Sequence, residues 1–454
     1  MKRKMLLSLA MIILLIVLTA CVNLRHEREA DFTHYFNDRS LFDNQTITVV
    51  TADAQLRQFA NAFTRYNPDA TIDVIVLAAG WEEVEYSRDW LRTRLLAGDA
   101  PVIMSSRFID TRDPSMSHFF ADLFPLMYAD PNFSENDYMM NVVRAFATNE
   151  QLFGFPWAFS YTQVVANSNV PGLANALAVR QTMGITSDEL MELHRLFSAG
   201  TQLYYANFHS VNSFVARHRH RFIDLESGQV NFASQEFIDV ITSAKELMNP
   251  SSISSPPGIV TGHIDPCQAT ELILSQTYSF RYVFCMQYNF EIEEIRLFVN
   301  PTPLVNEYGE LLVLAYDTYA ISSGATAAQQ VLAWDFIRFV SEYERIPLMV
   351  NYPSVNRNRQ QSANVYTYMR EVLRIFNQEA GLQPVGSISD AMQLKHDHYS
   401  ALALMPASAQ VPLPDSVIGA IWEVLHQFTN SLVTAQDAAH ELQNRVSLAL
   451  MEVQ

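Results

Sequence analysis

Two histidine pairs are the residues in this sequence whose spacing comes closest to a metal site. They occur in His218-Arg219-His220 and His396-Asp397-His398. Histidines two positions apart share a face only on a strand, so we interpret both pairs as solvated surface rather than as metal ligands. The sequence also lacks the Gly-x-Ser-x-Gly, His-Glu-x-x-His, Gly-x-Gly-x-x-Gly and P-loop patterns of common hydrolases, zinc proteases and nucleotide-binding proteins. We therefore expect no enzymatic activity, no metal and no cofactor.

Cys21 follows a segment with the layout of a secretion signal. Lys2, Arg3 and Lys4 precede a mostly apolar run from Met5 to Ala20, which is shorter than the roughly 20 residues that a membrane-spanning helix needs. The small residues just before Cys21 resemble the lipobox of bacterial lipoproteins, in which this cysteine receives lipid and becomes the mature N-terminus. We expect a signal peptide over residues 1–20 and a lipid anchor at Cys21, on the outer face of the cell membrane.

The other two cysteines, Cys267 and Cys285, form an even pair in an environment where disulfides persist. Sequence spacing cannot show whether their Cα atoms approach closely enough for a bridge, so a disulfide and two buried thiols both stay open.

The charge of the chain disfavours nucleic acid as a partner. The formal net charge is −18, and it becomes −21 once the three basic residues of the signal peptide are removed. A balance this acidic repels phosphate backbones and anionic lipid surfaces. The apolar fraction of 49% is ample for buried cores, and a mature chain of this length favours two or three domains.

The first part of the mature chain alternates between strand and helix patterns. Residues 22–44 are polar and without clear period, as expected for a spacer. Short β-type runs surround Val49, Val74 and Ile103, and helical stripes separate them at 56–63 and 83–96. Strand, helix and strand within a few tens of residues form a βαβ unit, which predicts a parallel sheet. Further along, the pattern at Thr186–Glu189 predicts a capping box, and Ser234 is predicted to begin a helix. A third helix is predicted at 331–340, with Trp334 in the core.

An ordered series of segments resembles the extracellular solute-binding proteins of ABC importers, the sugar-type family that includes maltose-binding protein. Each segment matches a short family pattern, and together they cover most of the mature chain. The segments are Leu95–Ile103, Ala121–Leu126, Leu152–Trp157, Val164–Asn167, Gly228–Ser234, Tyr319–Ser322, Ala333–Phe339 and Thr434–Val446.

This resemblance implies a two-lobed α/β fold of the periplasmic-binding-protein type II class, with the ligand held between lobes that close by hinge bending. Crossing segments near Val164–Asn167 and Leu314–Tyr319 are the expected hinges. The implied organisation is a signal peptide (1–20), a tether (21–44), lobe one (45–163 and 316–365) and lobe two (168–310 and 370–454).

Three aromatic residues are candidates for stacking on the apolar face of a sugar ring. Trp81 follows a predicted strand end, where parallel sheets place their ligand loops. Trp157 and Tyr161 follow the Gly-Phe-Pro of one matched segment, a region that lines the cleft in the family.

The polar candidates for ligand contact are chosen because their positions match those of ligand contacts in the family that the sequence resembles. Members commonly present polar ligand contacts at the ends of the first and third strands, and lobe two and the return crossing supply others. Val102 stands where members usually carry aspartate, so the polar network at that strand end differs here. The candidates are Asp53, Ser105, Ser106, Arg107, Asn212, Tyr288, Tyr316 and Asp317.

Taken together, the resemblance implies a monomeric, lipid-anchored subunit that captures a carbohydrate, such as an oligosaccharide, and passes it to membrane permease subunits. Two alternatives stay open. The ligand could be another solute, such as a peptide, a polyamine or a metal complex, or the fold could serve a surface sensor or adaptor that reports to a signalling partner.

Overall fold

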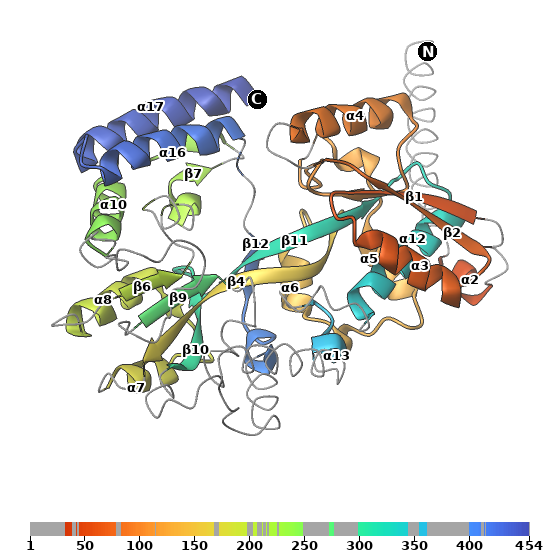
Figure 1. The fold of residues 1–454 in the computed structure, drawn as a ribbon, viewed down its shortest axis with the longest axis horizontal. Helices are drawn as coiled ribbons and strands as arrows, with labels where there is room; N and C mark the ends of the chain where they lie inside the picture. Colours follow the sequence, from red (N-terminus) through yellow and green to blue (C-terminus); the bar gives the residue numbers. More distant parts are fainter. Residues whose placement is uncertain are drawn as a thin grey trace, which may run out of the picture. The chain divides into compact units, whose positions relative to one another are not determined.

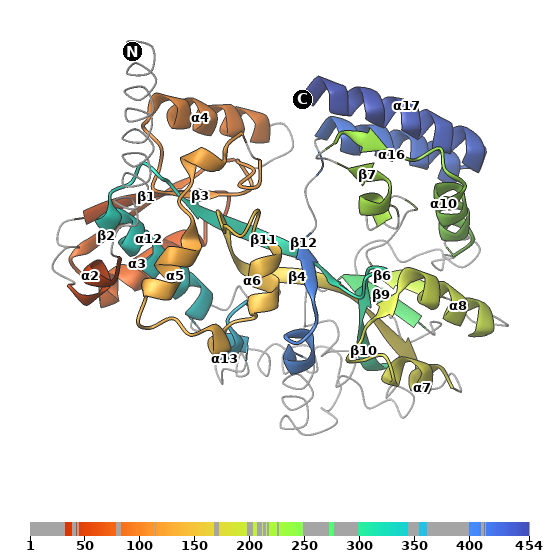
Figure 2. The ribbon, with the colours of Figure 1, turned by 180° about the vertical axis from the view of Figure 1, so that it is seen from behind.

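The structure is a computed structural model that describes most of the chain after residue 31 (Figures 1 and 2). The described residues are 32–38, 42, 45–78, 83–113, 115–167, 172–197, 203–206, 211, 215, 218–224, 227–247, 272–276, 298–343, 354–360, 399–409, 413 and 415–453.

The chain divides into two compact units. Unit 1 contains residues up to Glu135 together with Ala147–Phe155 and Thr318–Val340. Unit 2 contains Asn136–Phe146, Pro156–Asp317 and Ser341–Gln454. Each unit is therefore assembled from separate stretches of sequence, and the chain passes between the units several times. The lobe boundaries and hinge positions expected from the sequence stay predictions.

Unit 1 is built on a sheet of four strands. In sheet order they are β2 (Ala70–Val76), β1 (Gln45–Thr51), β3 (Ile103–Ser105) and the part of β11 (Leu311–Ile321) that begins at Thr318. β1 pairs in parallel with both neighbours, so Val49 lies beside Val74 and Ile103. β11 runs antiparallel to β3. The predicted βαβ unit and its parallel sheet are confirmed.

Helices cover both faces of this sheet, and the residues of the central strand β3 are all buried. On one face, Val50 and Met104 pack with Leu91 and Leu95 of α4. On the other face α3 contacts α12 through the Phe63 ring, which meets Phe336 and Phe339 edge-on. The helices of unit 1 are α2 (Phe32–Asn37), α3 (Leu56–Tyr66), α4 (Val84–Ala97), η2 (Ser117–Phe119), α5 (Leu123–Ala129) and α12 (Ala327–Glu342), whose last two residues belong to unit 2.

Unit 2 has its own strands, which belong to one sheet and one small hairpin. The sheet contains the start of β11, then β10, β4, β9 and β6, with β12 pairing to β11 and β5 to β10. The strands are β4 (Phe155–Asn167), β5 (Ile185–Thr186), β6 (Leu203–Ala206), β7 (Ile223–Asp224), β8 (Gln229–Val230), β9 (Leu272–Gln276), β10 (Phe298–Val305) and β12 (Ala407–Ala409).

A separate hydrophobic core holds unit 2 together. Leu190 of α8, Phe237 of α10 and Val424 of α16 contribute to it, and Phe222 and Phe232 pack against the Phe237 ring. The helices of unit 2 are η3 (Glu135–Asp137, which starts in unit 1), α6 (Met140–Ala145), α7 (Leu173–Ala178), α8 (Ser187–Phe197), η4 (Arg219–Arg221), α10 (Gln235–Leu247), α13 (Arg357–Gln360), α16 (Asp415–Thr429) and α17 (Ala435–Val453).

Several features of these helices were predicted correctly from short sequence patterns. The Thr186 hydroxyl accepts from the Glu189 amide at 3.2 Å, and the Glu189 carboxylate accepts from the Thr186 amide at 3.0 Å, which confirms the capping box. The Ser234 hydroxyl accepts from the Phe237 amide at 3.3 Å at the start of α10. Trp334 is fully buried in α12, as predicted.

No helix within the described part of the chain has the length and apolar character needed to cross a membrane. The predicted signal peptide and Cys21 lie outside the described residues.

A buried charge cluster ties α12 to the end of α5. The Asp130 carboxylate, whose side chain is fully buried, accepts from Trp334 Nε1 at 2.9 Å and forms an ion pair with Arg338 Nε at 2.8 Å. Arg338 also pairs with Asp335 at 2.9 Å. The cluster therefore fixes α12 by a charge interaction in addition to its apolar packing.

We expect Asp130→Ala to lower the free energy of unfolding by about 3–5 kcal/mol, because it removes one of the two carboxylates that pair with Arg338 and leaves the buried Trp334 Nε1 without its acceptor. Asp99→Ala is the matched control, since Asp99 forms an exposed pair with Arg94 and such pairs contribute about 0–1 kcal/mol. Urea unfolding of the two variants measures the difference. Equal losses would show that the cluster contributes no more than a surface ion pair.

Candidate ligand-binding site

The first cluster of candidate residues lies at the carboxyl ends of β1 and β3. In the parallel register Val50 lies beside Met104, so the loop that starts at Ala52 leaves the sheet next to the loop that starts at Ser106. Carboxyl ends of neighbouring parallel strands are the usual location of ligand loops in α/β sheets. We call this region, with Asp53, Ser105, Ser106 and Arg107, the unit 1 edge.

Hydrogen bonds hold the two loops of the unit 1 edge in place. The Thr51 hydroxyl accepts from the Asp53 amide at 3.0 Å, and Asp53 Oδ1 accepts from the Gln55 amide at 2.9 Å. On the β3 side, Ser105 Oγ accepts from the Arg107 amide at 3.2 Å. Buried Ser105 therefore shapes the loop, while Asp53 is partly exposed and Arg107 is exposed.

β11 completes the unit 1 edge from the other side of β3. The Ser106 amide donates to the Thr318 carbonyl at 2.9 Å, and Ser106 Oγ accepts from the Thr318 amide at 3.0 Å. Gly154 approaches the same threonine so closely that a Cβ atom there would lie 2.8 Å from Thr318 Oγ1. Glycine is thus required where the matched segment at 152–157 passes β11, and the edge draws on three distant parts of the sequence.

The remaining described candidates belong to unit 2, and the side chains of three of them are buried. Trp157 and Tyr161 on β4 are each 2% exposed, and Asp317 on β11 is 3% exposed. The backbone of Tyr316 lies on β11. Contact of either aromatic ring with a ligand would therefore need unit 2 to open locally, and their role as ligand contacts stays a prediction.

Tyr161 sits in a polar pair inside unit 2. Its hydroxyl donates to Gln163 Oε1 at 3.4 Å, and among the described residues Gln163 Nε2 has no hydrogen-bond partner. Burial raises the pKa of the Tyr161 phenol well above its ordinary value, and the charge of an ionised Tyr399 raises it further. Burial likewise raises the pKa of Tyr399. Both phenols are therefore neutral in the folded protein at ordinary pH.

Several predicted residues lie outside the described part of the chain. These are Trp81, Asn212 and Tyr288, together with the cysteines Cys21, Cys267 and Cys285 and the histidines His396 and His398.

The interpretation of His218 as solvated surface is wrong. Its side chain is 6% exposed and lies beside Arg221, whose Nη1 is 3.5 Å from His218 Nδ1. His218 is the residue just before the short 3-10 helix η4, and tertiary packing covers its side chain. In the described part of the chain, no group of three or more histidine, cysteine or acidic side chains is arranged to hold a metal ion.

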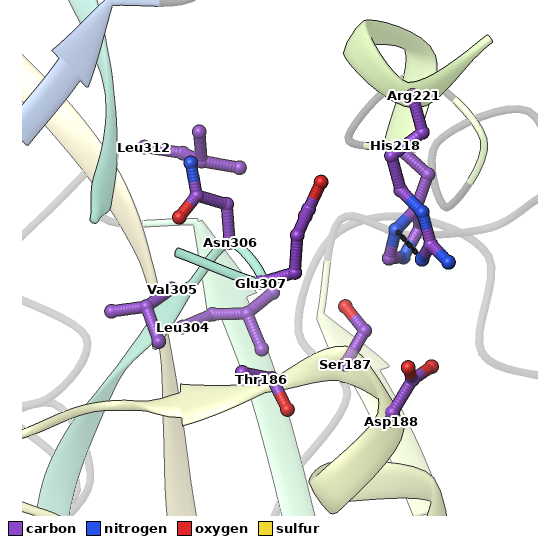
Figure 3. A pocket seen from close by; sticks show the side chains of 10 residues that line it. All are labelled: Thr186, Ser187, Asp188, His218, Arg221, Leu304, Val305, Asn306, Glu307 and Leu312. Atoms are coloured by element: carbon purple, nitrogen blue, oxygen red, sulfur yellow. Dashed lines mark hydrogen bonds between the residues drawn. The ribbon is translucent and has the colours of Figure 1, made fainter. Parts of the chain in front are cut away.

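His218 and Arg221 form one wall of a small pocket within unit 2 (Figure 3). Ser187 and Asp188, at the start of α8, lie opposite them, and Glu307 projects from the turn after β10. The cavity volume is about 20 Å³, against the roughly 300–1,000 Å³ of pockets that enclose small organic ligands. The pocket has room for a water molecule and is too small for a sugar ring.

An exposed tryptophan on α16 is a candidate that sequence patterns missed. Trp422 is 54% exposed, and its ring stacks on His426 with a centroid distance of 5.7 Å and an interplanar angle of 14°. The buried stripe of α16 includes Val417, Ile421 and Val424. Trp422 lies off this stripe, so a helical-wheel analysis of residues 415–429 identifies it as an aromatic ring presented to solvent.

Comparison with known proteins identifies the fold. No protein-family model and no curated protein matches the chain. Solved structures do match over nearly the whole chain: the sugar-binding protein MalE from Xanthomonas citri aligns with a TM-score of 0.60 at 13% identity, covering 90% of this chain and 98% of that one. This chain has the fold of an extracellular solute-binding protein.

Two further structures share this fold, and one of them was solved with a different kind of ligand. An extracellular solute-binding protein of family 1 from Alicyclobacillus acidocaldarius matches with a TM-score of 0.53 at 15% identity, covering 89% of this chain and 98% of the other. UgpB from Mycobacterium tuberculosis, solved with glycerophosphocholine, matches with a TM-score of 0.52 at 13% identity, covering 90% and 99%. The expected two-lobed α/β class is confirmed, while identities this low leave the ligand open.

The raised pKa of Tyr161 predicts how stability depends on pH. A phenol that stays protonated in the folded state stabilises that state below its unfolded pKa of about 10, and this contribution is lost as pH rises from there toward the folded pKa. Stability should therefore fall above pH 10. In Tyr161→Phe the decline should be shallower by up to about 1.4 kcal/mol per pH unit.

Denaturant unfolding between pH 9 and about pH 11 would measure these slopes. Tyr308→Phe is the matched control because Tyr308 is exposed. An unchanged slope in Tyr161→Phe would show that the Tyr161 phenol is accessible in the folded protein.

Proposed function

We propose that this protein is the lipid-anchored, substrate-binding subunit of an ABC importer and that it captures a carbohydrate. The observation that supports the proposal is the fold, which matches structures described as sugar-binding proteins over 90% of the chain. On this proposal, the protein neither forms nor breaks covalent bonds in its ligand. Its work is selective binding, which needs polar side chains for hydroxyl groups and flat apolar surface for sugar rings.

The described residues offer both kinds of surface. At the unit 1 edge, Asp53 and Arg107 provide a charged acceptor and a charged donor, and Ser106 begins the loop that carries Arg107. In unit 2, the Trp422 ring is exposed and pre-oriented by its stacking on His426. Aromatic rings held in one orientation lose little conformational entropy when they bind. We assign Asp53, Ser106, Arg107 and Trp422 as the ligand contacts to test first.

A phosphodiester of a polyol is the second candidate ligand. UgpB, of the same fold, is described with glycerophosphocholine. Arg107 is exposed at the end of β3, and a guanidinium group suits a phosphate group. The same binding screen separates this ligand from neutral sugars.

The first experiment is a thermal-shift screen of the protein against mono- and oligosaccharides, glycerophosphodiesters, amino acids, peptides and polyamines. A ligand that binds only the folded state at 100 times its dissociation constant adds about 2.7 kcal/mol, which raises the melting temperature by about 5 °C. We expect the shift with one sugar class. A shift with amines or peptides alone would overturn the carbohydrate proposal.

Trp422→Ala should weaken sugar binding about tenfold, because it removes a stacking surface of about 1–1.5 kcal/mol. Isothermal titration with the ligand from the screen measures the change. Tyr308→Ala removes another exposed aromatic ring of unit 2, from the turn between β10 and β11, and should leave affinity unchanged. Equal effects of the two variants would contradict the assignment of Trp422.

Cys21→Ser should abolish lipid attachment and release the chain from the membrane, because serine offers no thiol for a thioether link. Radiolabelled fatty acid incorporation and cell fractionation follow the two effects. A Cys21→Ser chain that keeps its label and stays with the membrane would show that the anchor lies elsewhere. Cys267→Ser is the control for general loss of a cysteine.

A further inference from the structure

A short helix that precedes the first strand packs on unit 1. α2 covers Phe32–Asn37, within the stretch 21–44 that the sequence predicts to be a tether. Phe36 is 6% exposed, and Phe42, just after it, is 4% exposed. α2 contacts α5, and both views place the two helices side by side (Figures 1 and 2). We call residues 32–38 together with Phe42 the strap.

The strap depends on this packing for its structure. Isolated helices shorter than about 12–15 residues are marginal in water, so six residues do not form a helix alone. Its exposed positions, Thr33, His34 and Asn37, are polar, while Phe36 is covered. Burial of the two phenylalanine rings is therefore what keeps this part of the chain on unit 1.

Docking of the strap shortens the segment that joins Cys21 to folded protein. A chain that was free up to β1 would have residues 22–44 between the lipid and the fold, a maximum span of about 80 Å. With the strap docked, only residues 22–31 lie between them, and these span at most about 35 Å. The reduction applies to unit 1, because the strap packs on that unit.

We propose that the strap acts as a standoff device, which holds unit 1 close to the bilayer because this part of the tether stays packed on unit 1. This inference rests on the proposed lipid anchor at Cys21. The length of residues 22–31 then limits the distance between unit 1 and the membrane. Unit 2 is connected to the anchor only through unit 1. A partner embedded in the same membrane would therefore contact unit 1 within a limited distance of the bilayer surface.

Hydrogen exchange of the full chain in detergent tests whether the strap is docked. The reporter is the Asp38 amide, which donates to the His34 carbonyl at 3.1 Å. We expect this amide to be protected, and its exchange to quicken by at least about tenfold in Phe36→Ala, because a buried aromatic ring is lost. Thr33→Ala, on the exposed side of α2, is the matched control. Exchange at the rate of an unfolded peptide in the unmodified chain overturns the proposal.

Neutron reflectometry of the lipidated chain on a supported bilayer tests the standoff itself. Releasing the strap with Phe36→Ala and Phe42→Ala should raise the mean height of the protein layer by about 10 Å, the difference in root-mean-square span of the two tether lengths. A Gly/Ser insertion between Glu29 and Ala30, as long as residues 22–31, is the positive control. An unchanged height in the released variant, with the insertion effective, overturns the proposal.

The outcomes separate this inference from the proposed function. Exchange and layer height need no ligand, so failure to bind sugar leaves both readouts intact. A chain that carries no lipid overturns the anchor and the standoff device together, and it leaves solute binding standing.

Discussion

The register between β1, β3 and β11 is the constraint on which the described part of the candidate site depends. Parallel pairing of Val50 with Met104 brings two loops to one end of the sheet. Antiparallel pairing of Tyr319 with Ser105 then places Thr318 against Ser106. Backbone hydrogen bonds are strong and leave little freedom of position, so a shift of one residue would move every side chain at this edge to the other face.

Burial divides the candidate residues into two groups with different physical roles. Ser105, Trp157 and Tyr161 are covered, and their hydrogen bonds and packing support the backbone around them. Arg107 and Trp422 are exposed, so the charge of one and the flat ring of the other face solvent. The distinction matters because a core aromatic and a binding aromatic look alike in the sequence, whereas only the second can stack on a ligand without cost to the fold.

Away from the candidate site, a buried ion pair and buried phenylalanine rings stabilise unit 1. The pair between Asp130 and Arg338 is buried, so it specifies the position of α12 more firmly than an exposed pair would. Also in unit 1, the buried Phe36 and Phe42 attach the strap by apolar contact. This polar segment with two buried phenylalanines therefore behaves as part of unit 1. The free segment between Cys21 and unit 1 is shorter as a result.

The sequence by itself determined the elements whose causes are local. Apolar periodicity predicted α3, α4 and the parallel β1 and β2, and the Thr186–Glu189 pattern predicted the cap of α8, because neighbouring residues set both. Tertiary structure decided what depends on distant contacts: that Trp157, Tyr161 and His218 are covered, that Trp422 is exposed, and that Phe36 is docked. A side chain's exposure is set by whatever packs against it from elsewhere in the chain, and no local pattern contains that information.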